Sequence, residues 1–269
     1  MDYGINLGYV TKKLSAQKAI EMIAKAGFKA LDYTPPVKEH NWHDSMTETL
    51  ECAQKNGLYI AQTHGPFNRY GSYGNNHLEA IDRAYRATVE LGAKYMVVHG
   101  DEYPANMPFD AEIALKHNHD LYLPYVKQAE KDGVKIAFET VFEDGKPIRR
   151  FCSKSDELKA LIESFNSPSA VCCWDFGHAY AEFGDKHVEE LKKLIQYVEC
   201  THVHDNHGAD YHEMPFMGNT DWDSCVKIMK EAGYNGVFCL EYVYGNMPEF
   251  VMEKYLKLSV EVCDYMWNQ

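Results

Sequence analysis

The sequence predicts an α/β protein, a single-domain (β/α)8 TIM barrel, and three observations support that prediction. Eight short apolar runs alternate with eight longer amphipathic runs along the whole chain. No glycine-rich phosphate fingerprint follows any of the short runs, which argues against an open dinucleotide-binding sheet. No linker or shift in composition divides the 269 residues, a length typical of one such barrel. We therefore expect one barrel domain over residues 1–269.

The short runs have the length and the apolar character of strands in a buried parallel sheet. We expect strands at 3–7, 30–34, 58–64, 95–99, 135–139, 171–175, 198–204 and 236–241. Side chains alternate along a strand, so residues two apart share a face. Three positions carry side chains small enough to point into a barrel: Ala137, Cys173 and Cys239. Their bulky neighbours are then expected to face the helices: Phe138, Trp174 and Leu240.

The longer runs place apolar residues at helical spacing. We expect helices at 15–27, 43–57, 75–92, 110–133, 155–165, 185–196, 220–233 and 247–266. Ser15 is a suitable N-cap residue for the first of them. Glycine suits the left-handed conformation at a helix end, and it stands there at Gly27, Gly133 and Gly233. Pro124 is expected to split or kink the fourth helix.

Composition narrows the class of protein. The chain is 45% apolar and 13% aromatic, enough to bury a large core. There is no signal-peptide pattern and no apolar run of 18 residues, so no membrane association is expected. The eight cysteines form no Cys-x-x-Cys pair, which favours buried thiols in a reducing, cytoplasmic protein. A formal net charge of −13 gives no general attraction for nucleic acid, so a small-molecule partner is expected, with a homo-oligomer left open.

Six of the eight expected strands end in a residue that can bind a metal: His64, His99, Glu139, Asp175, His204 and Glu241. The C-terminal strand ends form the active-site face of such a barrel, so these side chains should converge. One histidine at a strand end is more often a hydrogen-bonded polar residue than a ligand. Six polar groups buried together would repel or lack partners unless a cation joined them. The sequence therefore predicts a metal site.

The segments AFETV, WDFGHAY, HVHDN with DYH, and CLEYV resemble those of the xylose isomerase-like barrels. This superfamily contains sugar and sugar-phosphate isomerases and epimerases, inosose dehydratases and endonuclease IV, and the resemblance covers essentially the whole chain. Its epimerases imply a metal held by Glu139, Asp175, His204 and Glu241, with both glutamates as catalytic carboxylates and His178 in contact with substrate. Many epimerases of free ketoses place an arginine shortly after the histidine ligand, and this chain has none there.

Endonuclease IV holds three zinc ions, and the resemblance to it implies additional ligands: His64, His99, His178, Asp210 and His212. In a one-metal site, His64 and His99 are expected to contact substrate instead. The segment THVHDNHGADYH, residues 201–212, then forms one wall of the metal site. The expected cofactor is Mn²⁺ or Zn²⁺, one ion or up to three.

The favoured hypothesis is a divalent-metal-dependent isomerase or epimerase of a small sugar or sugar phosphate, working by proton transfer through a metal-stabilised enediolate. One alternative is other carbohydrate chemistry on the same barrel, such as an inosose dehydratase-like lyase. Another is an endonuclease IV-like apurinic endonuclease, against which the net charge and the lack of an arginine-rich segment stand. A non-catalytic binding barrel is the weakest hypothesis, because it would not need the whole ligand set.

Residues that would recognise the substrate are less sharply indicated. Four aromatic residues near strand ends are candidates for stacking on a sugar ring, with plain packing as the alternative: Tyr9, Trp42, Phe67 and Tyr244. Two arginines in loops are candidates for meeting a phosphate: Arg69 and Arg149. The sequence leaves the identity of the sugar, its phosphorylation and its stereochemistry open.

Overall fold

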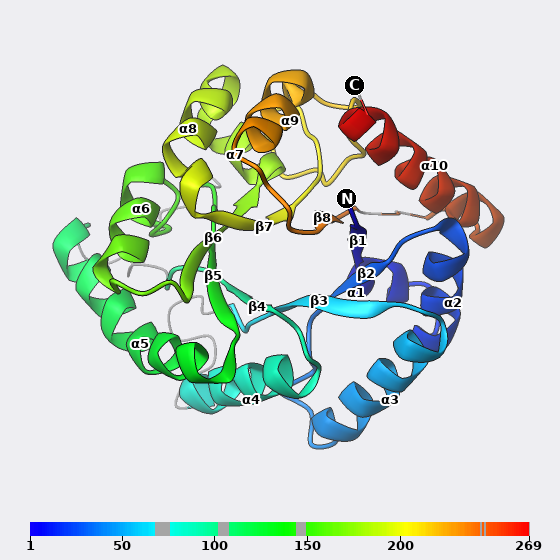
Figure 1. Cartoon of the computed structure of the whole chain (residues 1–269), viewed down its shortest axis with the longest axis horizontal. Helices are drawn as coiled ribbons and strands as arrows, with labels where there is room; N and C mark the ends of the chain where they lie inside the picture. Colours follow the sequence, from blue (N-terminus) through cyan, green and yellow to red (C-terminus); the bar gives the residue numbers. More distant parts are fainter. Residues whose placement is uncertain (68–75, 102–107, 144–148, 243, 245, 269) are drawn as a thin grey trace.

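The computed structural model describes residues 1–67, 76–101, 108–143, 149–242, 244 and 246–268. Eight parallel strands surround a central axis and helices cover them on the outside (Figure 1). The strands are β1 (Tyr3–Asn6), β2 (Ala30–Tyr33), β3 (Tyr59–His64), β4 (Tyr95–Val98), β5 (Lys135–Glu139), β6 (Ala170–Asp175), β7 (Val198–His202) and β8 (Phe238–Leu240). Their order in the sheet is β7-β6-β5-β4-β3-β2-β1-β8.

Strands β7 and β8, at the two ends of that order, close the barrel. Val203 and Leu240 form a parallel bridge. The Val203 N–H donates to the Cys239 carbonyl at 2.8 Å, and the Glu241 N–H donates to the Val203 carbonyl at 3.0 Å. The predicted (β/α)8 barrel is therefore confirmed.

Ten α-helices are present among the described residues: α1 (Leu7–Thr11), α2 (Ala16–Ala26), α3 (Trp42–Lys55), α4 (His77–Glu90), α5 (Ala111–Asp132), α6 (Ser155–Ser164), α7 (Phe176–Phe183), α8 (His187–Leu194), α9 (Trp222–Glu231) and α10 (Glu249–Asn268). Short 3-10 turns cover Gly184–Lys186 and Ile195–Tyr197. Helices α1 and α7 were not predicted. Each starts directly after a strand, where the side chain of Asn6 or Asp175 caps it by accepting a backbone N–H.

The predicted helix ends are confirmed at three glycines. Gly27 has a φ of +110°, and Gly133 and Gly233 both have a φ of +73°, the left-handed conformation that glycine adopts without a steric penalty. Pro124 lies inside α5 and does not split it. Tyr122 and Val126, one on each side of the proline, are buried against the barrel and hold the helix in place there.

Two apolar layers follow from the alternation along the strands. The larger lies between strands and helices and contains the predicted outward residues Phe138, Trp174 and Leu240. The smaller lies inside the barrel and consists of Tyr95, Val97, Ala137, Val171, Cys173 and Cys200. All eight cysteines are free thiols, and seven are buried. Across the described ranges, no helix is both long enough and apolar enough to cross a membrane.

Candidate metal centre

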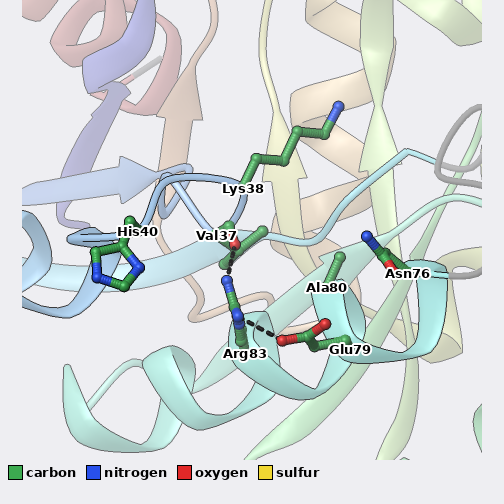
Figure 2. A pocket seen from close by; sticks show the side chains of 7 residues that line it. All are labelled: Val37, Lys38, His40, Asn76, Glu79, Ala80 and Arg83. Atoms are coloured by element: carbon green, nitrogen blue, oxygen red, sulfur yellow. Dashed lines mark hydrogen bonds and ion pairs between the residues drawn. The ribbon is translucent and has the colours of Figure 1, made fainter.

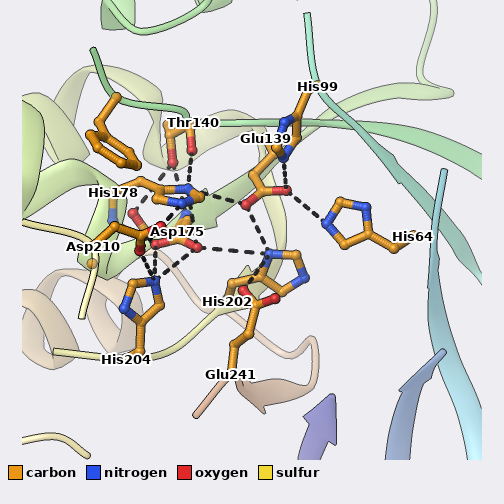
Figure 3. A network of polar contacts seen from close by, with 12 residues as sticks. His64, His99, Glu139, Thr140, Asp175, His178, His202, His204, Asp210 and Glu241 are labelled. Atoms are coloured by element: carbon orange, nitrogen blue, oxygen red, sulfur yellow. Dashed lines mark hydrogen bonds and ion pairs between the residues drawn. The ribbon is translucent and has the colours of Figure 1, made fainter. Parts of the chain in front are cut away.

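The C-terminal ends of the strands bring carboxylates and imidazoles together above the inner apolar layer (Figure 3). Four of these residues are the last of their strands: His64, Glu139, Asp175 and His202. His99 and Glu241 each follow a strand by one residue. The predicted convergence therefore occurs, and the structure divides the residues into three groups whose ligand atoms lie within 4.8 Å of one another.

The first group consists of His64, His99 and Glu139. The Nε2 atoms of His64 and His99 lie 3.2 and 2.9 Å from the same Glu139 oxygen, Oε2. The three side chains come from neighbouring strands β3, β4 and β5, so the barrel itself sets their spacing. Three donors of this kind leave a tetrahedral ion with one open position.

The second group, at the barrel axis, consists of Glu139, Asp175, His202 and Glu241. The sequence analysis placed His204 in this group, whereas in the structure His202 stands there. Strand β7 ends at His202, whose Nδ1 lies 3.0 Å from Glu139 Oε1 and 3.6 Å from Glu241 Oε2. His204 points to the same side but stands two residues beyond the strand end, which carries it into the neighbouring group.

Behind this second group stand two residues that the sequence did not single out. Asp32, fully buried on β2, accepts a hydrogen bond from His202 Nε2 at 3.0 Å. Asn6 donates to Asp32 at 3.1 Å and to Glu241 at 3.4 Å. The Asp32 bond fixes the imidazole so that Nδ1 faces the other ligands, a common arrangement behind metal-bound histidine. The sequence did contain one indication of Asp32, because it is a charged residue inside the apolar run ALDYT.

The third group consists of His178, His204, Asp210 and His212. Asp175 caps α7 by accepting the His178 N–H at 2.7 Å, and this explains the Asp-x-x-His spacing. His178 Nδ1 donates to the Thr140 carbonyl at 3.0 Å and His212 Nδ1 donates to the Glu241 carbonyl at 2.8 Å. Both histidines therefore turn Nε2 toward Asp210, at 3.8 and 3.0 Å.

The loop that carries Asp210 and His212 is shaped by the buried carboxylate of Asp205. Its oxygens accept hydrogen bonds from four donors: the backbone N–H groups of Asn206, Phe216 and Thr220 and the Trp222 indole. The Asp205 backbone also pairs with Glu213 on the far side of the loop. This network fixes the loop, so that Asp210 and His212 are held in position before any ion binds.

The protonation of the centre suits a cation. Burial would raise the pKa of the Glu139 carboxyl, but His202 and His99 outweigh it and hold that pKa well below its usual range. Burial opposes a proton on His178, yet Asp175 and Glu139 raise its pKa to about 10. Burial lowers the pKa of His99 to about 4. Protons on histidine thus balance buried carboxylates in the metal-free chain, and a divalent ion can replace them.

A cavity of about 290 Å³ opens over the three groups. Tyr9 and Phe67 line it, in keeping with their prediction as stacking candidates. The other two aromatic candidates, Trp42 and Tyr244, are packed in the core. Arg150 also lines the cavity, with its guanidinium 5.3 Å from the centre of the Phe142 ring.

Of the two predicted phosphate contacts, Arg149 and Arg69, only Arg149 lies in the described part of the chain, and it does not line the cavity. Arg149 turns away from it and forms ion pairs with Glu143 and Glu157. Arg69 lies outside the described residues.

A second hollow, of about 460 Å³, lies between the segment after β2 and the start of α4 (Figure 2). Its arginine is engaged, because Arg83 donates to the Val37 carbonyl at 2.9 Å and pairs with Glu79. None of the three ligand groups contributes to its lining. A smaller hollow between the two shares Lys38 with this one and His64 with the metal centre. The larger volume alone therefore does not mark the active site.

Comparison with known proteins agrees with this architecture. A family model described as "Xylose isomerase-like TIM barrel" matches residues 20–261. The "Uncharacterized protein MJ1311" of Methanocaldococcus jannaschii is 25% identical over 230 residues, 76% of each chain. The "Probable endonuclease 4" of Mycoplasma mobile is 28% identical over 160 residues, which span 55% of this chain and 54% of that protein.

Solved structures show the same fold along the whole length. A D-tagatose 3-epimerase-like protein superposes with a TM-score of 0.79 at 23% identity, covering 98% of this chain and 99% of the other. The IolI protein, in a structure "with a binding zinc atom", superposes with a TM-score of 0.79 at 19% identity, covering 99% and 98%. At these identities the likeness is one of fold.

Proposed function

The chain belongs to the xylose isomerase-like TIM barrel family, and on that basis we propose that it is a divalent-metal-dependent isomerase or epimerase of a small sugar or sugar phosphate. The observation that carries the proposal is the group of Glu139, Asp175, His202 and Glu241 beside a small cavity. Two carboxylates of that group, Glu139 and Glu241, line the cavity themselves. A volume of about 290 Å³ suits a small molecule rather than a polymer.

We assign Glu139 and Glu241 as the acid–base pair as well as ligands. One carboxylate removes a proton from the carbon next to the substrate carbonyl, and the other returns a proton to the neighbouring carbon or to the opposite face. A bound Mn²⁺ or Zn²⁺ ion would supply Lewis-acid stabilisation of the negative charge that forms on the substrate oxygens. Asn6 holds Glu241 by a hydrogen bond to Oε1, which leaves the second oxygen for chemistry.

The cavity walls support a carbohydrate substrate. Tyr9 and Phe67 offer aromatic faces, and Tyr9 is fixed by contact with His212, its hydroxyl lying 3.3 Å from Nε2. Arg150 adds a permanent positive charge to a lining that contains several carboxylates.

The test uses solvent deuterium. An isomerase or epimerase acting by proton transfer incorporates deuterium from D₂O at a carbon of its sugar during turnover, across a panel of ketoses and ketose phosphates. Glu139→Gln and Glu241→Gln should each slow this exchange by about 10²–10⁴-fold. Glu199→Gln is the matched control, because Glu199 lies near the opposite end of β7 and pairs there with Lys135. Exchange coupled to loss of water would assign a lyase instead, and no exchange with any sugar contradicts the proposal.

A second function, apurinic endonuclease, is supported by two specific observations. Three adjacent ligand groups are more than a one-metal epimerase needs, and part of the chain matches a probable endonuclease 4. Clustered ions of this kind suit phosphodiester hydrolysis. The net charge of −13 and the small cavity weigh against a duplex substrate. Cleavage of an abasic duplex, weakening steeply with salt, would favour the nuclease.

A further inference from the structure

The last helix, α10, carries a row of exposed side chains on its outward side. Figure 1 shows α10 on the outside of the barrel, and it packs against α2 and α9. Its opposite side, which includes Leu256 and Cys263, is buried in the core. Residues at spacings of three and four lie on one side of a helix. The exposed row, which we call the α10 stripe, consists of Phe250, Lys254, Leu258, Glu261 and Tyr265.

The apolar members of the α10 stripe are unusually open to solvent. Phe250, Leu258 and Tyr265 are 63%, 46% and 59% exposed. The apolar surface continues onto the loop after β7, where the half-exposed ring of Phe216 lies 5.9 Å from that of Tyr265, centre to centre. Phe216 has a φ of +72°, which is disfavoured for an aromatic residue, and its N–H donates to buried Asp205 at 3.0 Å. Apolar side chains gathered on one exposed face indicate contact with another molecule.

The two charged members of the α10 stripe have no opposite charge to pair with in their own chain. Lys254 and Glu261 are seven residues apart, so about 10 Å of helix separates them. Lys254 lies over the Phe250 ring, 5.8 Å from its centre, and neither charge forms an ion pair within the described ranges. On the side of α10 that faces α2, by contrast, the glutamates are paired: Glu249 with Lys18 and Glu253 with Lys25.

The order of residues in the α10 stripe is self-complementary. Phe250 and Tyr265 stand eight and seven residues from Leu258, and Lys254 and Glu261 stand four and three residues from it. When two copies of α10 pack antiparallel about a two-fold axis at Leu258, Phe250 of one protomer faces Tyr265 of its partner. Lys254 of one protomer then faces Glu261 of its partner, and the symmetry forms this pair twice.

We infer that the chain forms a two-fold symmetric homodimer through the α10 stripe, with the two α10 helices antiparallel. The net charge of −13 makes two copies repel one another in general. The α10 stripe carries one positive and one negative charge, so two copies can meet there without that repulsion. The aromatic residues at its ends are of the type that contributes most to protein interfaces. The inference goes beyond the proposed function and does not depend on the metal or the sugar.

Sedimentation equilibrium over a series of concentrations at fixed ionic strength tests the dimer. We expect the wild-type chain to dimerise and Leu258→Asp to be monomeric, because two like charges would meet at the axis. Lys254→Glu and Glu261→Lys should each weaken the dimer by about tenfold or more, since two attractive pairs become repulsive. Lys116→Glu is the matched control, a charge reversal at an exposed position on α5, and it should leave the dimer unchanged. Far-UV circular dichroism checks that each variant is folded.

Mixing the two charge variants tests the antiparallel pairing itself. A Lys254→Glu protomer has two negative charges in the stripe and a Glu261→Lys protomer has two positive charges, so only the mixed dimer regains both ion pairs. We expect the mixture to sediment as a dimer at a concentration at which each variant alone is monomeric. A wild-type chain that is monomeric at every concentration overturns the inference and assigns the stripe to a different partner. A dimer that survives Leu258→Asp, or charge variants that form no mixed dimer, overturn it as well.

Discussion

On strand β5, Ala137 packs against apolar side chains inside the barrel, whereas Glu139, two residues further on, is surrounded by histidines. The same step separates Cys173 from Asp175 on β6 and Cys200 from His202 on β7. Both members of each pair point inward, so the height along the strand decides between the two environments. We call the apolar cluster inside the barrel the lower layer and the three ligand groups above it the upper layer. Burial of apolar side chains stabilises the lower layer, whereas the upper layer concentrates negative charge that a cation can balance.

This contrast predicts that metal removal separates activity from folding. Treatment with a chelator should abolish deuterium exchange, since the carboxylates lose the ion that fixes them, and added Zn²⁺ or Mn²⁺ should restore it. The far-UV circular dichroism should remain that of the folded chain, because neither apolar layer includes a ligand. Loss of the dichroism signal on chelation would mean that the barrel needs the metal in order to fold, and that the apolar layers alone do not stabilise it.

A carboxylate placed in the lower layer, two residues before Glu139, should lower the stability of the chain more than any other single substitution considered. Ala137 is fully buried and belongs to the lower layer, whose other members are Tyr95, Val97, Val171, Cys173 and Cys200. Ala137→Asp should lower the free energy of unfolding by about 3–5 kcal/mol, the cost of an uncompensated buried charge. Urea denaturation measures it, with Ala137→Ser as the uncharged control. A stable Ala137→Asp chain would show that water reaches the lower layer.

Loss of Asp32, which lies behind the upper layer, should weaken metal binding less than loss of a ligand. Asp32→Asn removes the charge that orients His202 but keeps the size of the side chain. The affinity for the metal should fall by about 10–100-fold, the usual effect of losing such a partner. A zinc titration against a fluorescent competitor measures this, with Asp44→Asn, exposed on α3, as the control. Equal affinities for the two variants would show that Asp32 does not orient the ligand.

The sequence predicted the lower layer and most of the upper one, because strand phase follows from side-chain size and the ligands follow from strand ends. It placed His204, and not His202, in the second group, and the two residues share a face two positions apart. That choice depends on where pairing between β7 and its neighbours stops, which is a tertiary property. Asp32 was missed because one polar residue in an apolar run resembles an ordinary strand residue until its partner, 170 positions away, is known.

The smallest expected effect is the change in metal affinity over one pH unit. His178 and His99 of the upper layer contribute differently to it. The pKa of His178 is raised to about 10, so in the metal-free chain at pH 7 it carries a proton that a metal must displace. The pKa of His99 is lowered to about 4, so His99 is already neutral and releases none. Each proton released makes the affinity fall about tenfold per pH unit as the pH falls.

Zinc titrations at pH 6, 7 and 8 measure this slope, and calorimetry in buffers of different ionisation enthalpy counts the protons. The same raised pKa predicts an opposite trend for the stability of the chelated chain. His178 contributes stability that is fully present below its unfolded pKa of about 6.5 and is lost as the pH rises toward about 10. The chelated chain should therefore lose stability from His178 across the range in which zinc binding strengthens. Zinc affinity that stays constant from pH 6 to 8 would mean that the metal-free site is held without these protons, and the charge balance proposed for the upper layer would fail.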